Sequence, residues 1–403
     1  MSDANFLDKL LDGVEVELLP LGDVTQYEQP TKYLVITTNY SDEFDTPVLT
    51  AGKTFILGYT DEMNGIYKAS EKPVIIFDDF TTANKWVDFD FKAKSSAMKM
   101  ISSSDEDRFL IKYIYYWLNT LPSELVDGDH KRQWIGNFSN KKIPIPCPDN
   151  PKKSLKIQAE IVRILDAFTE LTTELTTELT ARKKQYNYYR DQLLSFEDRE
   201  VEWLPLGQPK VGEFIRGGGL QKKDFTDTGV GCIHYGQIYT HYGTYAYKTK
   251  TYVSEAFFNK ARKAKTGDLV IATTSENDED VCKSVAWLGS EEIAVSSDAC
   301  IYRHKLNPKY VSYFFQTEQF QKQKRQHITG TKVRRVNADD LAKILIPIPS
   351  SEEQARIVAI LDKFDALTNS ITEGLPREIE LRQKQYEYYR DLLFSFPKPE
   401  VMA

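Results

Sequence analysis

Apolar residues recur every three or four positions between residues 155 and 196, a pattern that predicts one long amphipathic helix. A helix of that length spans ~60 Å at ~1.5 Å per residue. Residues 354–396 repeat the pattern, with an interruption at Gly374 and Pro376. A rod with a single apolar stripe is not stable alone and must pack on another helix. We therefore expect these two helices to pair with each other in an antiparallel coiled coil.

The segments outside the helices mix strand and helix patterns. Residues 72–77 (KPVIIF) and 267–272 (GDLVIA) are short apolar runs bounded by breakers, which predicts buried strands. Residues 109–118 (FLIKYIYYWL) and 308–316 (PKYVSYFFQ) predict aromatic-rich amphipathic helices. Each of the two segments is therefore expected to fold as a mixed α/β (α+β) domain.

One order of motifs occurs twice in the chain. VELLPLG at 16–22 matches VEWLPLG at 201–207, and IPIP occurs at 143–146 and 346–349. QAEIVRILDAF at 158–168 matches QARIVAILDKF at 354–364, and RKKQYNYYRDQLLSF at 182–196 matches RQKQYEYYRDLLFSF at 382–396. Four matches in the same order indicate a tandem duplication, and hence pseudo-two-fold symmetry. The predicted parts are a first domain at 1–150, a helix at 151–200, a second domain at 201–350 and a C-terminal helix at 351–403.

The first predicted helix contains a low-complexity tract in which TELT is repeated three times, at 169–180. Slippage during DNA replication accounts for its origin, but its consequence is physical. A four-residue unit adds ~6 Å of helix and turns the helix face by ~40° beyond one full turn. We expect the tract to adjust the length of the helix.

Composition indicates a folded chain, with 41% hydrophobic residues, 23 Tyr and 21 Phe among 403 residues. No run of 18 apolar residues occurs and the acidic start lacks a signal-peptide core, so no membrane segment and a cytoplasmic location are expected. The four cysteines lie far apart in sequence, which favours reduced buried thiols over a disulfide framework or a zinc site.

The net charge of −7 is unevenly distributed along the chain. Residues 1–150 hold 15 Lys and Arg against 24 Asp and Glu, whereas residues 201–350 hold 21 against 16. Binding to DNA requires cations placed against phosphates. If DNA is the ligand, the first half must use a local basic patch, or a partner must supply positive charge.

Two divergent α/β blocks that alternate with two duplicated long helices resemble the specificity (S) subunits of type I restriction–modification enzymes. The resemblance covers the whole chain, and its most specific segments are 182–196 and 375–396. It is closest to the subgroup with a tetrapeptide repeat in the central spacer helix. The resemblance implies two target-recognition domains, each reading one half of a split double-stranded DNA sequence, held apart by the paired helices.

The same resemblance implies partners and cofactors. Two methyltransferase (M) subunits are expected to bind the helices, to carry S-adenosylmethionine and to methylate adenine at N6. Restriction (R) subunits are expected to join them and to use ATP and Mg²⁺. No cofactor is expected in this chain, which the resemblance makes a non-catalytic subunit of a host-defence system.

One set of residues resembles a nuclease site. Two carboxylates at 78–79 follow a predicted strand, and Asp-Phe-Lys at 90–92 follows them, a combination that can hold Mg²⁺ and a water. The equivalent strand of the second half is followed by threonines at 273–274, so we interpret the carboxylates as solvated turn residues. The chain also lacks an Asn/Asp-Pro-Pro-aromatic segment, and its histidines lack metal-ligand spacing. No catalytic or metal-binding residue is predicted.

Reading duplex DNA requires Lys and Arg for phosphates and planar donors for base edges, with Arg suited to guanine and Gln to adenine. Basic segments precede IPIP in both halves, at 128–134 and 329–336. In the first half the candidates are Lys131, Arg132, Gln133 and Trp134, with a second patch of Thr82, Asn84, Lys85, Lys92, Lys94 and Lys99. In the second half they are Lys332, Arg334 and Arg335, with Lys322, Lys324, Arg325, Arg262, Lys263 and Lys265.

Apolar and Tyr-Arg positions of the helices are the candidates for spacer packing and for contact with M subunits. They are Ile161, Leu165, Phe168, Tyr186, Tyr189 and Arg190 in the first helix, and Ile357, Leu361, Phe364, Tyr386, Tyr389 and Arg390 in the second. Two alternatives remain open, a protein-docking adaptor and an autonomous DNA nuclease. The recurrence of the basic segments favours DNA recognition over the adaptor, and the absence of the carboxylate pair from the second half disfavours the nuclease.

Overall fold

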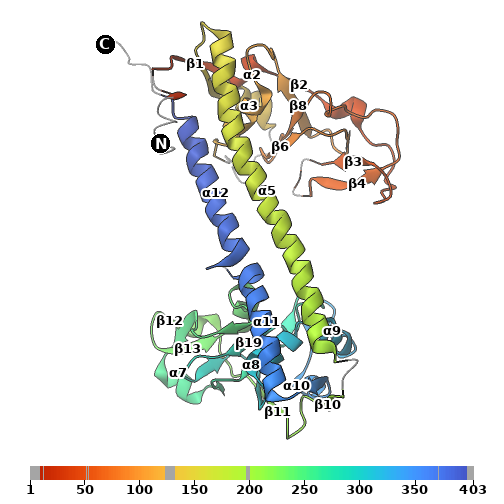
Figure 1. The fold of residues 1–403 in the computed structure, drawn as a ribbon, viewed down its shortest axis with the longest axis vertical. Helices are drawn as coiled ribbons and strands as arrows, with labels where there is room; N and C mark the ends of the chain where they lie inside the picture. The colour runs from red at the N-terminus through yellow and green to blue at the C-terminus, as the bar shows by residue number, and fades with distance from the viewer. Residues whose placement is uncertain are drawn as a thin grey trace. The chain divides into compact units, whose positions relative to one another are not determined.

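The computed structural model describes residues 10–11, 13–50, 52, 54–122, 132–196, 200–370 and 372–396. The chain divides into two compact units (Figure 1). Unit 1 comprises Met1–Thr173 with Leu381–Ala403, and unit 2 comprises Glu174–Glu380. Each unit thus holds one globular domain and a part of both duplicated helical regions. Among the described residues, no helix is long and apolar enough to cross a membrane.

The globular part of unit 1 is built on two small sheets, ordered β2-β8-β5-β6 and β4-β3-β7. Its strands are β1 (Val16–Pro20), β2 (Thr25–Glu28), β3 (Thr46–Leu49), β4 (Ile56–Thr60), β5 (Val74–Asp78), β6 (Asn84–Val87), β7 (Lys92–Ala93), β8 (Met98–Ser103) and β9 (Lys142–Pro146). Its helices are α2 (Leu21–Val24), η1 (Pro30–Tyr33), α3 (Ile111–Leu118), α4 (Gln133–Gly136) and η2 (Phe138–Asn140). The predicted strand at 72–77 is β5, which is buried along its whole length, and the predicted aromatic helix is α3.

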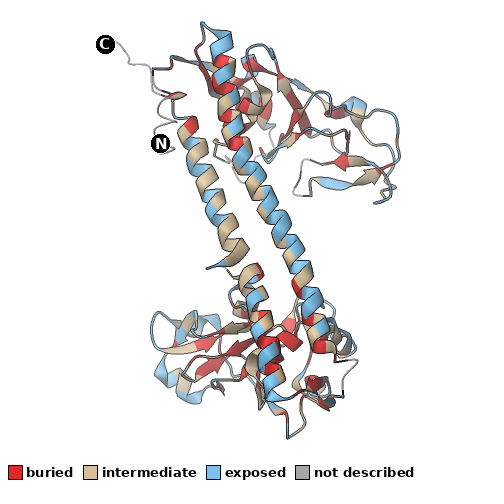
Figure 2. Cartoon of the chain, in the orientation of Figure 1, coloured by how far each residue is buried: buried red, intermediate tan, exposed pale blue. Residues whose placement is uncertain are grey.

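The globular part of unit 2 is built on two five-stranded sheets, ordered β11-β21-β17-β19-β14 and β12-β15-β13-β20-β16. Its strands are β10 (Glu202–Pro205), β11 (Gly212–Arg216), β12 (Phe225–Thr226), β13 (Val230–Ile233), β14 (Tyr245–Ala246), β15 (Thr251–Val253), β16 (Lys263–Ala264), β17 (Leu269–Ala272), β18 (Thr274–Ser275), β19 (Ser284–Trp287), β20 (Ile293–Val295), β21 (Ala299–His304), β22 (Arg334–Arg335) and β23 (Leu345–Ile348). Its helices are η3 (Lys222–Asp224), α6 (Tyr235–Thr240), α7 (Glu255–Lys260), α8 (Pro308–Phe314), α9 (Glu318–Arg325) and α10 (Ala338–Leu341). Buried residues follow the central strands of this unit (Figure 2). Strands and helices occur together in both globular parts, which confirms the predicted mixed α/β domains.

The duplicated VE-x-LP and IPIP motifs pair with each other in each domain. In unit 1, β1 and β9 form an antiparallel ladder from Val16↔Pro146 to Pro20↔Lys142. In unit 2, β10 and β23 form the equivalent ladder from Glu202↔Ile348 to Pro205↔Leu345. Each variable block therefore leaves and returns at neighbouring strands, so its two ends are fixed to each other by backbone hydrogen bonds.

The first duplicated helix, α5 (Pro151–Ser195), is continuous over 45 residues, or ~67 Å at ~1.5 Å per residue. The TELT tract lies inside it and is helical throughout. Threonine hydroxyls of the tract donate to carbonyls four residues earlier, as in Thr173 Oγ1 to Thr169 O at 2.8 Å. These bonds engage the threonine hydroxyls with carbonyls of the helix itself.

The second duplicated region consists of two helices, α11 (Ser351–Asn369) and α12 (Gly374–Leu393). The predicted interruption therefore occurs. Gly374 has φ +76°, and a Cβ there would lie 2.3 Å from the carbonyl oxygen of Ala366, so only glycine fits. Pro376 follows in the first turn of α12, where its missing N–H leaves no hydrogen bond unmade.

Both helical regions pack on each domain. In unit 1, Ile161 and Leu165 of α5 join one hydrophobic core with Leu393 of α12. In unit 2, Ile357 and Leu361 of α11 join one core with Tyr186 of α5. The sequence prediction assigned the apolar stripe to packing between the helices. Its most buried members do share a core with the other helical region, but they share it with the globular domain as well, which was not predicted. They are buried because they cover the domain sheets and helices, with the other helix beside them.

Direct contact between the helical regions uses residues at the edge of this stripe. The rings of Phe168 and Tyr389 stack at 5.3 Å in unit 1, where α5 and α12 run in opposite directions (Figure 1). The rings of Tyr189 and Phe364 stack at 5.7 Å in unit 2. Under the sequence duplication these are the same pair of residues, so each unit repeats the packing of the other.

Candidate nucleic-acid interface

The basic segment of the first domain is fixed to the end of strand β5. The backbone N–H of Gln133 donates to Asp79 O at 2.8 Å, and that of Trp134 donates to Asp79 Oδ1 at 2.9 Å. Arg132, which precedes them, is exposed, and Lys131 lies outside the described residues. Trp134 is 2% exposed and packs on Phe77 with ring centroids 5.1 Å apart. Its assignment as a DNA-reading residue was wrong, because its indole fills the domain core.

The second predicted patch of the first domain is not one surface. Lys99 is fully buried and pairs with buried Asp79 at 3.5 Å. Lys92 is 2% exposed, pairs with Glu62 at 2.9 Å and donates to Asn64 O at 2.6 Å. Thr82, at φ +60°, is also buried. These three predictions were wrong, because the side chains are buried in the domain.

Glu62 shows the strength of one such internal contact. Burial raises the pKa of its carboxyl, but hydrogen bonds from Lys92 and from the amides of Thr37 and Ile36 outweigh burial and lower the pKa to about 2. Lys92 is therefore committed to the fold. Of the predicted patch, Lys85 and Lys94 are exposed and Asn84 is half-buried.

The basic segment of the second domain forms a closed loop. Thr329 and Arg335 exchange two backbone hydrogen bonds of 2.9 Å, and β22 pairs with β18 in the register Thr274↔Arg335. Arg334 is held inside the loop, with an ion pair to Asp278 at 2.8 Å and a hydrogen bond to Gly330 O at 2.6 Å. Arg335 is exposed, and no ion pair or side-chain hydrogen bond fixes its guanidinium within the described part of the chain. Lys332, also exposed, belongs to the same loop.

The two basic segments occupy equivalent positions in their domains. The first lies against Asp79, just after strand β5, and the second against Thr273, just after strand β17, through Val336 N–H to Thr273 O at 3.2 Å. Each basic segment ends in a buried side chain, Trp134 at 2% and Val336 at 1% exposure. The basic segments therefore recur in the fold as well as in the sequence. Each places its cations beside the end of the equivalent strand, β5 in the first domain and β17 in the second.

The other predicted cations of the second domain are divided among several elements. Lys324 is fully buried and donates to the carbonyls of Glu279 and Val281 at 3.0 and 2.9 Å, so its assignment to a DNA surface was wrong. Burial lowers the pKa of this lysine.

Lys322 and Arg325 are exposed on α9, and Arg325 pairs with Glu318 at 3.0 Å. Arg262, Lys263 and Lys265 lie at or beside β16; Lys263 covers the Phe258 ring at 4.3 Å and Lys265 pairs with Glu292 at 3.5 Å.

Two hollows border the loop at 329–336. One, of about 420 Å³, is lined by Arg335 together with Arg216, the last residue of β11. The other, of about 430 Å³, is lined by Val333 together with Tyr235, Tyr239 and others. Arg216 is exposed and was missed in the sequence, where an isolated Arg before a glycine run gives no signal.

The carboxylates that resemble a nuclease site have structural roles. Asp78 accepts hydrogen bonds from the N–H groups of Phe80 and Thr81 at 2.8 and 3.2 Å, which closes the turn after β5. Asp90 pairs with Lys68 at 2.7 Å. Asp78 and Asp79 are buried, so the prediction of solvated carboxylates was wrong. Among the described residues, no group of three His, Cys, Asp or Glu could hold a metal ion.

A polar network joins the aromatic helix of the first domain to α5. Lys112 pairs with Asp166 at 2.9 Å, and the Tyr116 hydroxyl donates to the same carboxylate. Gln158, fully buried on α5, accepts a hydrogen bond from Leu110 N–H at 2.9 Å. Burial, followed by the bond to Asp166, raises the pKa of Tyr116. The hydroxyl therefore remains a donor and orients the domain on the helix.

The second domain repeats this network with equivalent residues. Lys309 pairs with Asp362 of α11 at 2.7 Å, and the Tyr313 hydroxyl donates to Asp362 at 2.7 Å. Gln354 accepts from Asn307 N–H at 2.8 Å. The sequence carries a signal that was missed: Lys-Tyr-x-x-Tyr occurs at 112–116 and at 309–313. Both domains are thus attached to their helices by the same side chains.

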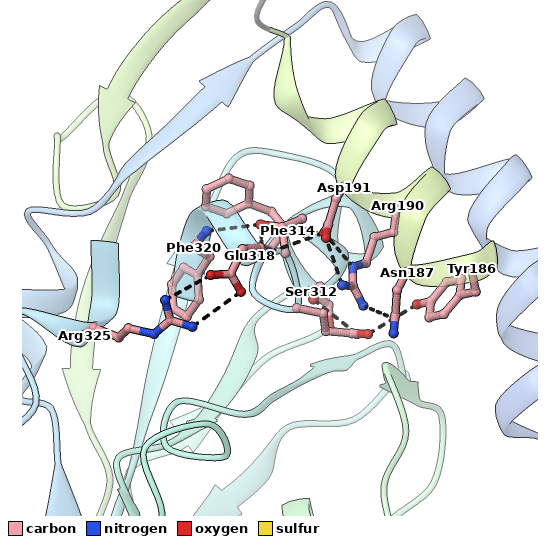
Figure 3. Close-up of polar contacts among 11 residues, drawn as sticks. Tyr186, Asn187, Arg190, Asp191, Ser312, Phe314, Glu318, Phe320 and Arg325 are labelled. Atoms are coloured by element: carbon pink, nitrogen blue, oxygen red, sulfur yellow. Dashed lines mark hydrogen bonds and ion pairs between the residues drawn. The ribbon is translucent and has the colours of Figure 1, made fainter. Parts of the chain in front are cut away.

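The Tyr-Arg-Asp motif of α5 forms a further junction in unit 2 (Figure 3). Arg190 donates to Asp191 Oδ1 at 3.2 and 3.1 Å, and the same oxygen accepts from Glu318 N–H, at the start of α9, at 3.3 Å. The hydroxyl of Tyr186, under the Arg190 guanidinium, donates to Gln316 at 3.2 Å. The motif therefore fixes the end of α5 to the second domain. Arg390 and Asp391 repeat the intrahelical pair at 2.7 Å.

Burial separates the helix residues that were predicted to meet M subunits. Ile161, Leu165, Tyr186, Arg190, Ile357 and Leu361 are buried; Phe168, Phe364, Tyr386, Tyr389 and Arg390 are half-buried; Tyr189 is 38% exposed. The buried members pack within this chain, and the half-buried and exposed members remain the candidates for contact with M subunits.

Comparisons with known proteins agree on one family. Residues 13–183 and 207–381 each match the type I restriction modification DNA specificity domain. The chain is 55% identical, over 100% of both sequences, to the specificity subunit of the Escherichia coli type I restriction enzyme EcoR124I/EcoR124II. Its fold matches the S subunit of a type I restriction–modification system from M. genitalium with a TM-score of 0.55 at 13% identity, covering 96% of this chain and 98% of that one. A chain solved in work on complex assembly and conformational transition of the type I R-M system matches with a TM-score of 0.57 at 15% identity, covering 95% and 98%.

Proposed function

The chain belongs to the type I restriction–modification specificity family and is its DNA-recognition subunit, and on that premise we propose that each globular domain reads one half of a bipartite duplex target. Specificity subunits are non-catalytic components of these systems. The observation that carries the proposal is the match of one specificity domain to each half of the chain, together with the equivalent basic segments beside β5 and β17.

Arg132 is the proposed base-reading residue of the first domain and Arg335 that of the second. Both arginines are exposed. Arg132 lies two residues before Trp134, whose backbone N–H donates to Asp79, and Arg335 lies in β22, which pairs with β18. A guanidinium held on such a segment can form two hydrogen bonds with guanine O6 and N7 in the major groove. The exposed Lys85, Lys94, Lys322 and Lys332 are proposed to contact phosphates, which contributes affinity without sequence preference.

The partners are proposed to be two methyltransferase M subunits, which carry S-adenosylmethionine, and restriction R subunits, which use ATP and Mg²⁺. The paired helices are proposed to recruit the M subunits and to set the spacing of the half-sites. The support for two equivalent docking regions is that the helix–domain junction of one unit repeats that of the other. The acidic first half also fits a complex in which partners supply positive charge to the DNA-binding surface.

Two arginine variants test the proposal. In the complex with M subunits, Arg132→Ala and Arg335→Ala should each weaken specific binding by ~1–3 kcal/mol and relax the preference of one half-site only. Arg163→Ala is the matched control, because it removes the same charge from the exposed surface of α5, where Arg163 pairs with Glu160. The measurement is a titration of duplexes in which each half-site is randomised in turn.

The control variant should bind with unchanged preference in both half-sites. If Arg132→Ala and Arg335→Ala also leave affinity and preference unchanged, the basic segments are not the readers. If one variant relaxes both half-sites, the assignment of one half-site to each domain is wrong.

A further inference from the structure

The loop between Thr329 and Arg335 carries an exposed apolar side chain. Val333 is 45% exposed and lies between two basic residues, Lys332 and Arg334. It lines one of the two hollows that border the loop, with Tyr235 and Tyr239. An aliphatic side chain has no charge or donor with which to bind phosphate. If Val333 contacts DNA, it must therefore contact an apolar group.

Internal contacts of the loop fix the place of Val333. Gly330 has φ +89°, and a Cβ there would lie 2.1 Å from Val333 O, so the loop turns tightly at this glycine. Arg334 binds Gly330 O and Asp278, and Arg335 pairs with Thr329 across the loop. β-Branching further restricts the Val333 side chain. Little conformational entropy remains to be lost when this side chain contacts a ligand.

The loop closes as an antiparallel bridge between Thr329 and Arg335, and the major groove of B-DNA admits a pair of antiparallel strands. A pair of antiparallel backbone segments fits a groove ~12 Å wide, and the thymine 5-methyl is the apolar group that a base pair presents there. Lys332 and Arg335, both exposed and on either side of Val333 in the loop, are placed to approach phosphates or guanine. Arg334 is committed to Asp278 and acts as a positioning residue.

We propose that the loop at 329–335 enters the major groove and that Val333 selects a thymine through its 5-methyl group. The proposal rests on the proposed function, because it assumes that the second domain reads one half-site. It adds one base of that half-site and the chemical group by which this base is distinguished. Losing contact with one methyl group should weaken binding about fourfold.

The experiment removes the methyl group from the DNA and the side chain from the protein. In the complex with M subunits, each thymine of both half-sites, on both strands, is replaced singly by deoxyuridine, which pairs identically but lacks the methyl. The wild-type complex should lose about fourfold in affinity at a thymine of one half-site. Val333→Ala should bind the unmodified site more weakly and show no further loss at that thymine.

Lys332→Ala is the matched control from the same loop. It should weaken binding to all duplexes alike and reduce the salt dependence of binding by ~1 unit of slope, while keeping the deoxyuridine effect. The proposal is overturned if no deoxyuridine weakens wild-type binding, if the half-sites contain no thymine, or if Val333→Ala keeps the wild-type loss. A wild-type complex without preference for its methylated sequence over unrelated DNA would instead contradict the proposed function itself.

Discussion

Deleting Thr173–Thr176, one unit of the TELT tract, should shorten the gap between the two half-sites. The deletion removes four residues from the continuous helix α5, which is ~6 Å at ~1.5 Å per residue. At ~3.4 Å per base pair along duplex DNA, this corresponds to one or two base pairs. The tract suits such a change because α5 has no buried residue between Leu165 and Tyr186. The deletion therefore removes no side chain from either domain core.

Helical phase decides which deletions α5 tolerates. Four residues leave a rotation of ~40° beyond a full turn, which a small change in helix winding can absorb. Removing Thr176 alone leaves a rotation of ~100°. That rotation would turn either Phe168 away from Tyr389 or Tyr189 away from Phe364. The buried apolar residues of α5 in the same unit would turn away from their core with it. The single-residue deletion is thus the matched control, smaller in size and larger in effect.

The assay is sequencing of methylated adenines in cells that express the M subunits with each variant. The four-residue deletion should methylate the same two half-sites with a gap shorter by one or two base pairs, and the single-residue deletion should lose activity. An active four-residue deletion with an unchanged gap would refute the reasoning, because the length of α5 would then not set the spacing.

Three further outcomes follow from particular contacts. Tyr313→Phe removes the hydroxyl that donates to Asp362, and should lower the free energy of unfolding by ~1.5–3 kcal/mol in urea denaturation; an unchanged midpoint would remove this bond from the junction. Trp134→Ala should cost ~3–5 kcal/mol by opening a cavity, whereas a loss of DNA preference with stability unchanged would return Trp134 to the reading surface. Burial lowers the pKa of His304 to about 4, below the usual ~6.5 of the unfolded chain. As the pH falls from ~6.5 towards 4, the unfolded chain therefore binds a proton at this histidine that the folded chain does not bind, and the free energy of unfolding decreases. Unfolding should cost ~2 kcal/mol less at pH 5 than at pH 7, a difference that His304→Phe should reduce and that must persist in the variant if other groups cause it.

Periodicity and repetition were sufficient to predict the architecture. Both long helical regions, the interruption at Gly374, the buried strands β5 and β17 and the aromatic helices α3 and α8 occur where the pattern predicts them. These features depend on local spacing of apolar residues, which sequence displays directly. The pairing of β1 with β9 was not predicted, because a ladder between distant strands leaves no local signal.

The candidate site was predicted less well, for a physical reason. Lys92, Lys99 and Lys324 look like surface cations in sequence, but each is buried on a carboxylate or on backbone carbonyls. Long amphipathic side chains are compatible with either environment, and partners far away in sequence decide between them. The repeated Lys-Tyr-x-x-Tyr could have been found, since repetition had already located the other shared motifs.

Exchanging residues 23–140 for the first variable block of another specificity subunit tests the central claim that each domain reads one half-site. The exchanged segment lies between β1 and β9, whose ladder fixes the two ends of the block beside each other. The measurement is sequencing of methylated adenines in cells that express this chimaera with the M subunits. We predict a bipartite target in which one half-site is new and the other half-site is unchanged. A chimaera that assembles with M subunits and methylates the original sequence, or one with both half-sites changed, would contradict the account.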